Sequence, residues 1–93
     1  MTRSNSVSLT VLYFAWVKEK VGTGEEQLSP PDNAKTVSDF IDWLETQSPA
    51  HASAFSDRNQ IRVALDQLHV PFETDIGDAK EIAFFPPVTG GAW

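Results

Sequence analysis

A single apolar segment, residues 7–15 with the sequence VSLTVLYFA, places the strongest constraint on the fold. It is rich in the β-branched and aromatic residues that suit pleated strands. Because successive side chains of a strand point to opposite faces, alternate residues from Leu9 to Tyr13 share one face, while Leu12 and Phe14 lie on the other. Apolar residues on both faces predict a central strand that is either covered on both sides or keeps one face for a partner.

The chain has 93 residues and no cysteine, so an apolar core must stabilise it without disulfides or thiolate metal sites. We expect one domain. The net charge of −6 argues against nucleic acid and membranes as partners and favours a basic protein surface. No apolar run reaches the ~20 residues of a membrane span and residues 1–6 do not begin a secretion signal, so we expect a cytoplasmic protein.

The clearest helix is predicted to begin at Thr36. Thr36 and Asp39 have the spacing of a capping box, and apolar residues recur at helical spacing over residues 37–44. This stripe should pack on the sheet, with Trp43 either at the edge of the core or against a partner.

The other predicted elements are short. They are a helical turn at 16–21 ended by glycines, a strand at 26–28, a helix at 49–55, a hairpin of strands 61–65 and 68–72, and a last strand at 81–85. This order predicts an α+β domain in which one main helix packs across a mixed sheet.

The titratable residues do not suggest an active site. His51 and His69 lack the spacing of metal ligands, and we interpret both as ordinary polar histidines at the surface or in the hairpin. The acidic pair at residues 25–26 and the carboxylates of Asp75 and Asp78 are interpreted as solvated surface. We therefore predict no metal site.

The segment after the last strand carries a more specific signal. Phe85 is followed by Pro86 and Pro87, which fix φ and should make a stiff, extended arm. Gly90 and Gly91 have no Cβ atoms and suit a narrow channel in a partner enzyme. A frayed tail is the alternative.

The motif FFPPVTGG at residues 84–91, together with LYFA at 12–15 and VALDQ at 63–67, closely resembles the family of small, sulfur-carrying subunits of molybdopterin synthase. The resemblance extends over residues 7–91. It implies a ubiquitin-like β-grasp domain at residues 1–91 with a flexible tail at 86–91. Residues 92–93 are an extension beyond the Gly-Gly pair.

The resemblance also implies that the carboxylate of Gly91, next to Gly90, is the reactive group. In this family an activating enzyme uses ATP and Mg²⁺ to join that carboxylate to AMP, and a sulfurtransferase persulfide then converts it to a thiocarboxylate. The large synthase subunit receives the tail, and the sulfur attacks a pyranopterin precursor. The carrier itself binds no cofactor and contributes positioning and one reactive atom.

A docking surface for the large subunit follows from the same resemblance. The implied partner-binding residues are Phe14, Lys18, Leu68, Phe85, Pro86, Pro87, Val88 and Thr89. Plain core packing is the alternative for Phe14 and Phe85. Lys18 stands where the family often has arginine, and lysine cannot form the same bidentate contact.

The chain departs from the family pattern at Ala92 and Trp93, because Gly91 carries a peptide bond in place of a free carboxylate. Our main hypothesis is a precursor from which a peptidase removes both residues. The alternative is a β-grasp interaction or modifier domain that cannot be activated. A thiamine-pathway sulfur carrier shares the fold and the Gly-Gly pair, although that family's tail usually lacks FFPP.

Overall fold

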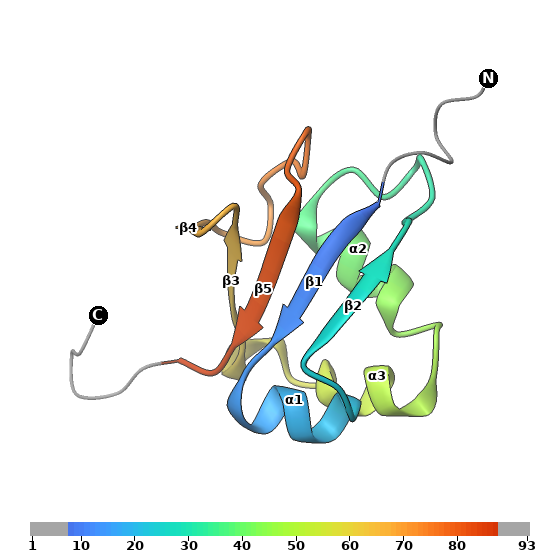
Figure 1. Cartoon of the computed structure of the whole chain (residues 1–93), viewed down its shortest axis with the longest axis vertical. Coiled ribbons are helices and arrows are strands. Elements are labelled where there is room, and N and C mark those ends of the chain that lie inside the picture. The colour runs from blue at the N-terminus through green and yellow to red at the C-terminus, as the bar shows by residue number, and fades with distance from the viewer. Residues whose placement is uncertain (1–7, 88–93) are drawn as a thin grey trace.

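The computed structural model of the chain describes residues 8–87. Its strands form one sheet in the order β2-β1-β5-β3-β4, in which β1 and β5 are parallel and the other neighbours are antiparallel (Figure 1). The strands are β1 (Leu9–Tyr13), β2 (Glu25–Leu28), β3 (Arg62–Leu65), β4 (Leu68–His69) and β5 (Glu81–Phe85). The helices are α1 (Ala15–Val21), α2 (Val37–Leu44), α3 (Pro49–Ala54) and the 3-10 turn η2 (Arg58–Gln60).

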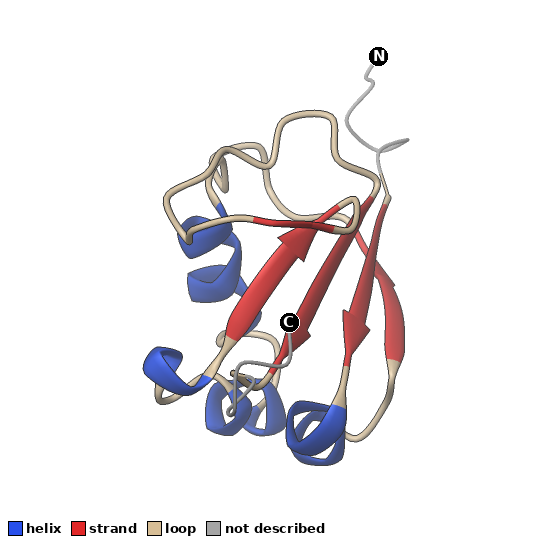
Figure 2. Cartoon of the chain, turned by 90° about the vertical axis from the view of Figure 1, so that its left-hand side faces the viewer, coloured by secondary structure: helices blue, strands red, loops and turns tan. Residues whose placement is uncertain are grey.

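This arrangement confirms the predicted α+β fold with one main helix across a mixed sheet. Figure 2 shows that the helices lie on one side of the sheet and at its lower end, while the other side of the sheet carries no helix. Such a layout is that of the β-grasp fold. Within residues 8–87, no helix has the length and apolar character needed to cross a membrane.

The core lies between the sheet and α2. The predicted inward face of β1 is confirmed, since Leu9, Val11 and Tyr13 are buried. The stripe of α2 is also confirmed, and its buried residues are Val37, Phe40, Ile41 and Leu44. Trp43 is half-buried at the edge of this core, with its ring 5.7 Å from that of Phe40.

Phe84 of β5 lies at the centre of the core. Its ring centroid is 4.8 Å from that of Phe55 and 6.3 Å from those of Tyr13 and Phe40. Edge-to-face and stacked ring pairs of this kind add to the free energy gained by apolar burial. These contacts hold the inward side chains of β1 and β5 in place. The residues between them along each strand point to the opposite face of the sheet.

The predicted capping box begins α2. Thr36 Oγ1 accepts a hydrogen bond from the Asp39 N–H at 3.1 Å, and Asp39 Oδ2 accepts one from the Thr36 N–H at 3.2 Å. These bonds satisfy N–H groups that the first turn of a helix leaves unpaired. The hydrogen bonds from the N–H groups of Thr36 and Lys35 lower the pKa of the Asp39 carboxyl below its ordinary value.

The predicted hairpin of β3 and β4 is present, but its second strand is shorter than the predicted 68–72. Asp66 and Gln67 form the turn with left-handed φ values of 48° and 72°, which a tight two-residue hairpin requires. The Val70 N–H still donates to the Val63 carbonyl at 3.2 Å. Pro71 has no N–H to donate, so strand pairing ends at that point.

Candidate functional site

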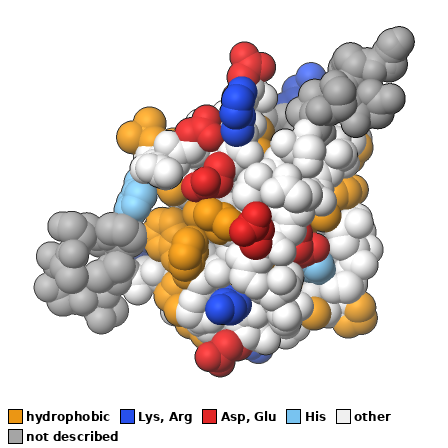
Figure 3. Space-filling view, viewed as in Figure 1, with side chains coloured by type: hydrophobic (Ala, Val, Ile, Leu, Met, Phe, Trp, Pro, Cys, Tyr) orange, Lys and Arg blue, Asp and Glu red, His pale blue; other side chains and the backbone are white. Residues whose placement is uncertain are grey.

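The uncovered face of the sheet is apolar at its middle. Leu12 of β1, Ala83 of β5 and Ala64 of β3 lie side by side in one row, because Leu12 is paired with Ala83 and Ala83 with Ala64. Leu12 is half-buried, and Ala64 and Ala83 are themselves buried. All three alternate along their strands with residues of the core cluster and so point to the opposite face of the sheet. Figure 3 shows hydrophobic side chains gathered on this face over β1 and β5, with acidic side chains beside them.

This face is hollowed into a groove of about 620 Å³, which we call the sheet groove. The paired alanines keep it open, because their short side chains leave space between larger neighbours. The residues that line the sheet groove are Leu12, Phe14, Ala64, Gln67, His69, Glu81, Ala83, Phe85 and Pro86. It is an apolar surface with a carboxylate and an amide at its rim, which suits a protein segment better than a charged small molecule.

The backbone around Phe14 explains its exposed position. The Phe14 N–H donates to the Phe84 carbonyl at 3.1 Å, so the residue continues the pairing of β1 with β5. Ala15 then adopts a φ of 55°, a left-handed conformation that residues with a Cβ atom rarely adopt. The chain turns there into α1 and leaves the Phe14 side chain 48% exposed on the open face.

The structure brings some of the predicted docking residues together and separates others. Phe14, Phe85 and Pro86 line the sheet groove, and neither phenylalanine is buried in the core. Leu68 is 68% exposed, but it is paired with the inward residue Leu65 and lies at the sheet edge outside the groove. Lys18 is exposed on α1 and is also outside the groove lining.

Lys18 nevertheless has a defined position. A Cβ atom added at Gly24 would lie 3.2 Å from Cε of Lys18, so the lysine stem crosses the glycine that precedes β2. Its ammonium group therefore lies near the end of the sheet at which β1 enters α1.

The predicted tail site is only partly within the described residues. Pro87 is the last residue that the structure describes. The positions of Val88, Thr89, Gly90 and Gly91, and of the extension Ala92 and Trp93, lie outside the described residues. What the structure does give is the place from which the tail departs, since Pro86 lies at the groove.

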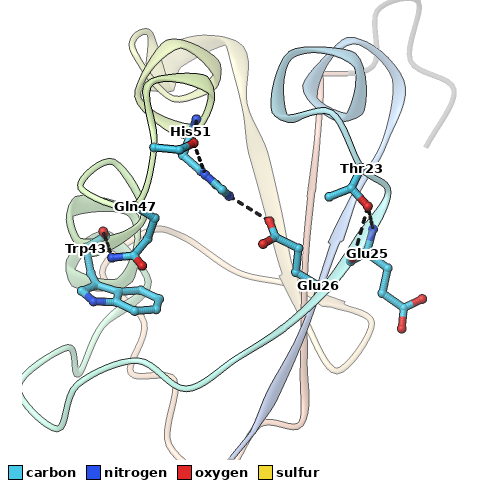
Figure 4. A network of polar contacts seen from close by, with 7 residues as sticks. Thr23, Glu25, Glu26, Trp43, Gln47 and His51 are labelled. Carbon is cyan, nitrogen blue, oxygen red and sulfur yellow. Dashed lines mark hydrogen bonds and ion pairs between the residues drawn. The ribbon is translucent and has the colours of Figure 1, made fainter.

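A second polar cluster lies on the helical side of the sheet. Nε2 of His51 in α3 is 2.8 Å from the Glu26 carboxylate in β2, and Nδ1 is 2.7 Å from the Ser48 hydroxyl (Figure 4). The ring of His51 lies 6.2 Å from that of Tyr13. Burial, and then the nearby Glu26 carboxylate, raise the pKa of the Tyr13 hydroxyl above its ordinary value.

This cluster corrects two sequence interpretations. His51 is only 8% exposed and is not a surface histidine, because α3 packs its ring toward the sheet. Glu26 is half-buried and paired, whereas its neighbour Glu25 is exposed as predicted. His69 is exposed in the hairpin, also as predicted. Within residues 8–87, no three His, Cys, Asp or Glu side chains are grouped so that they could hold a metal ion.

Sequence reasoning did not find the two alanines that line the middle of the sheet groove. The sequence pattern places Ala64 and Ala83 in strands, but only the register of β3 with β5 shows that they lie side by side on the open face. It also missed His69 and Gln67. His69 enters the groove lining because it is paired with Ala64 across β3 and β4, and Gln67 lies in the turn that joins these two strands. The alternation in residues 81–85 already placed Ala83 on the same face as Phe85, and that signal was available.

Comparison with known proteins shows similarity to one protein family. The ThiS family profile matches residues 11–91. The molybdopterin synthase sulfur carrier subunit of Escherichia coli (strain K12) is 37% identical over 83 residues, which cover 89% of this chain and 99% of that protein. The human protein of the same name is 35% identical over 88 residues, covering 87% of this chain and 91% of that protein.

Solved structures show the same fold. Small archaeal modifier protein SAMP1 from Haloferax volcanii has a TM-score of 0.66 and 27% identity, covering 90% of this chain and 99% of that one. A putative molybdopterin converting factor, subunit 1, from Pyrococcus furiosus has a TM-score of 0.69 at 24% identity and covers 88% of this chain and 99% of that one. The second likeness supports the fold alone.

Proposed function

This chain belongs to the ThiS family, and we propose that it is the sulfur-carrier subunit of a molybdopterin synthase. The observation that carries the proposal is the match over residues 11–91, which runs through the last strand to the Gly-Gly pair. Relatives that bear the synthase name match nearly their whole length. The partner that the name implies is a large synthase subunit.

The reactive group in this proposal is the carboxylate of Gly91. A carboxylate is a poor electrophile, so an activating enzyme first joins it to AMP, using ATP and Mg²⁺ and releasing pyrophosphate. The terminal sulfur of a persulfide then displaces AMP, and a second thiol cleaves the resulting S–S bond to leave a thiocarboxylate. No side chain of the carrier is needed for these steps, and no cofactor is assigned to it.

The sheet groove is the proposed docking surface. Phe14, Phe85 and Pro86 present exposed apolar area on it, and apolar anchors of this kind dominate the binding energy of interfaces. The tail departs from the groove, so docking there would orient residues 88–91 toward the partner. Lys18 and Leu68 lie outside the groove and would contact the partner only if the interface extends past it.

Activation requires a free carboxylate on Gly91, and in the encoded chain that group is joined to Ala92. We therefore include a processing peptidase that removes Ala92 and Trp93. The proposed location is the cytoplasm, which stays a prediction.

The test uses the version that ends at Gly91 and, as its matched control, the 93-residue chain. We expect only the shorter version to gain a sulfur in place of an oxygen when it is incubated with an activating enzyme, ATP, Mg²⁺ and a sulfur donor, as measured by intact mass. That product should bind the large subunit and convert the precursor. Sulfur incorporation without binding or conversion would contradict the synthase assignment.

A second candidate is a protein modifier, which is favoured by the likeness to SAMP1 at 27% identity. A modifier joins its terminal carboxylate to a lysine of another protein. The same assay separates the two candidates, because a modifier would form covalent adducts with cell proteins and would not convert the precursor. Activity in thiamine synthesis, and not with the pterin, would point to the third alternative.

A further inference from the structure

We propose that His69 is a specificity-determining residue of the sheet groove, and that the partner docks only against its neutral imidazole. Docking on this face is then coupled to the loss of the proton that the imidazole carries at lower pH. The partner is the large synthase subunit, so the inference rests on the proposed function. It goes beyond that function because it gives docking a pH dependence and assigns this dependence to one residue.

One row of side chains crosses the open face of the sheet from edge to edge and ends at His69. From β2 to β4, its members are Glu25, Leu12, Ala83, Ala64 and His69. The three middle members are apolar and line the sheet groove, and His69 lines the groove with them. A partner that covers the apolar middle of the row therefore also covers the imidazole.

The imidazole of His69 lies against an aromatic ring that the partner must also cover. Its ring centroid is 5.2 Å from that of Phe85, which lines the same groove. His69 is exposed in the unbound chain, so water can solvate either of its protonation states there. Docking removes that water, and a protonated imidazole loses more hydration free energy in this step than a neutral one.

The charged groups on the neighbouring strands lie away from His69. On β5, Glu81 lines the groove, but it belongs to the row of Thr10, and β3 separates β5 from β4. On β3, the Arg62 guanidinium is turned toward η2, because its Nη1 donates to the carbonyl oxygen of Ile61 at 3.2 Å.

Two further carboxylates lie near the ends of the row. Oδ1 of Asp66, in the turn before β4, accepts the N–H groups of Lys80 and Glu81 at 3.0 and 3.1 Å. Glu25 lies on β2, at the opposite edge of the sheet from His69. Glu25 and Glu81 thus attract basic groups of the partner to other parts of the face, and these groups repel a positive charge on His69.

Hydrogen bonding favours the same form of the imidazole. The chain has a net charge of −6, so its partner surface is basic and presents N–H donors. A neutral imidazole has one ring nitrogen that accepts a hydrogen bond, whereas a protonated imidazole has two donors and no acceptor. Desolvation, charge and hydrogen bonding therefore all select the neutral state of His69.

The sign of the pH dependence follows from these effects. Because the docked chain binds fewer protons than the unbound chain, its affinity for the partner falls as the pH falls. The change belongs to the range of ~pH 5–8, in which histidine side chains ordinarily change charge.

Calorimetric titration of the version ending at Gly91 with the isolated large subunit tests the proposal. We expect binding to be about threefold weaker at pH 6 than at pH 8, because the apparent affinity scales with the fraction of chains that are competent to bind. His69→Gln keeps a polar side chain that cannot titrate, and it should lose most of this difference. Circular dichroism checks that its fold is kept.

The number of protons exchanged gives a second readout that a purely structural role of His69 would not change. At pH 6, the heat of binding is measured in two buffers that differ in their enthalpy of ionisation. We expect the parent to release more protons per docked chain than His69→Gln does. Groups that titrate elsewhere on the two proteins contribute equally to both measurements.

A matched control moves the imidazole by one residue. Leu68→His, combined with His69→Gln, keeps a histidine on β4 but places it outside the groove lining and on the opposite face of the strand. This variant should not regain the pH dependence of the parent. If it does, an imidazole anywhere on β4 is sufficient, and the role of the groove contact is refuted.

The outcomes separate this inference from the proposed function. If the parent and His69→Gln bind the large subunit with parallel pH profiles, the inference fails and the proposed function stands. Tighter binding of the parent at pH 6, lost in the variant, would mean that a protonated His69 meets a carboxylate of the partner, which also overturns the inference. If no version binds at either pH, the proposed function fails and the inference falls with it.

Discussion

At the scale of single residues, Tyr13 is the most unusual side chain of the core. Its hydroxyl is buried, and no hydrogen bond of good geometry reaches it within residues 8–87. The Glu26 carboxylate lies close enough to raise the pKa of this hydroxyl, after burial itself. A buried polar group without a well-formed hydrogen bond destabilises the folded state, because water solvates the same group in the unfolded chain.

Tyr13→Phe should therefore leave the free energy of unfolding unchanged or raise it by about 1–2 kcal/mol. The ring contacts with Phe84, Phe55 and His51 remain in this variant. Urea denaturation measures the change. Tyr13→Ala is the control and should cost about 3–5 kcal/mol by leaving a cavity. A loss of more than about 1 kcal/mol in the phenylalanine variant would show that the hydroxyl is bonded after all.

A second prediction at this scale concerns the contribution of Asp39 to the pH dependence of stability. Because hydrogen bonds from the N–H groups of Thr36 and Lys35 lower its pKa in the folded chain, the unfolded chain binds more protons between that lowered value and the ordinary 3.8. The contribution of Asp39 to stability is thus complete above the ordinary value and is lost as the pH falls through the folded value.

The measurement is the free energy of unfolding from pH 6 to pH 2 for the parent and for Asp39→Asn. Other carboxylates titrate in both proteins, so the informative quantity is the difference between the two curves. We expect that difference to shrink as the pH falls, and two parallel curves would refute the role of the carboxylate.

At the scale of elements, the contact between Glu26 and His51 joins α3 to β2, although the two residues are 25 positions apart in the sequence. His51 reaches Glu26 with one ring nitrogen and Ser48 with the other. Ser48 also caps α3 by accepting the His51 N–H at 3.1 Å. The short helix is therefore held against the sheet by a polar contact as well as by its apolar residues.

A double-mutant cycle tests this contact. We expect Glu26→Ala and His51→Ala to be coupled by about 1–2 kcal/mol in the free energy of unfolding. The exposed neighbour Glu25→Ala, combined with His51→Ala, is the matched control and should be additive within about 0.5 kcal/mol. Additive effects in the first cycle would mean that the contact between Glu26 and His51 does not hold α3 against the sheet.

The same elements show how far sequence reasoning extends. The bounds of β5 and the capping box of α2 were predictable, because strand ends at prolines and the Thr36–Asp39 spacing are local signals. The pairing of Glu26 with His51 and of Ala64 with Ala83 was not, because both depend on which strands and helices become neighbours in space. The tail was recognised from its motif, and its geometry lies outside the described residues.

At the scale of the whole molecule, the fold assigns opposite tasks to the two faces of the sheet. The helical face contains the aromatic core around Phe84. The open face has the sheet groove, and Pro86, which precedes the Gly-Gly motif in the sequence, is among its lining residues. Acidic groups such as Glu81 lie at the rim, and the chain carries a net charge of −6. A partner that is apolar at its centre and basic around it fits this face.

A substitution at Phe14 can test docking without disturbing the core, because Phe14 is exposed on the open face and is not part of the buried core. In the version ending at Gly91, Phe14→Ser should weaken binding to the large subunit at least tenfold, or about 1.4 kcal/mol. The midpoint of thermal unfolding should change little. Calorimetric titration measures the binding.

Leu68→Ser is the comparison that defines how far the interface extends, since Leu68 is more exposed than Phe14 but lies outside the groove. If docking is confined to the sheet groove, this variant binds as the parent does, although it removes a similar amount of apolar surface. An equal loss in both variants would mean that the partner also covers the edge at β4. If Phe14→Ser kept full affinity, the open face of the sheet would not be the docking surface.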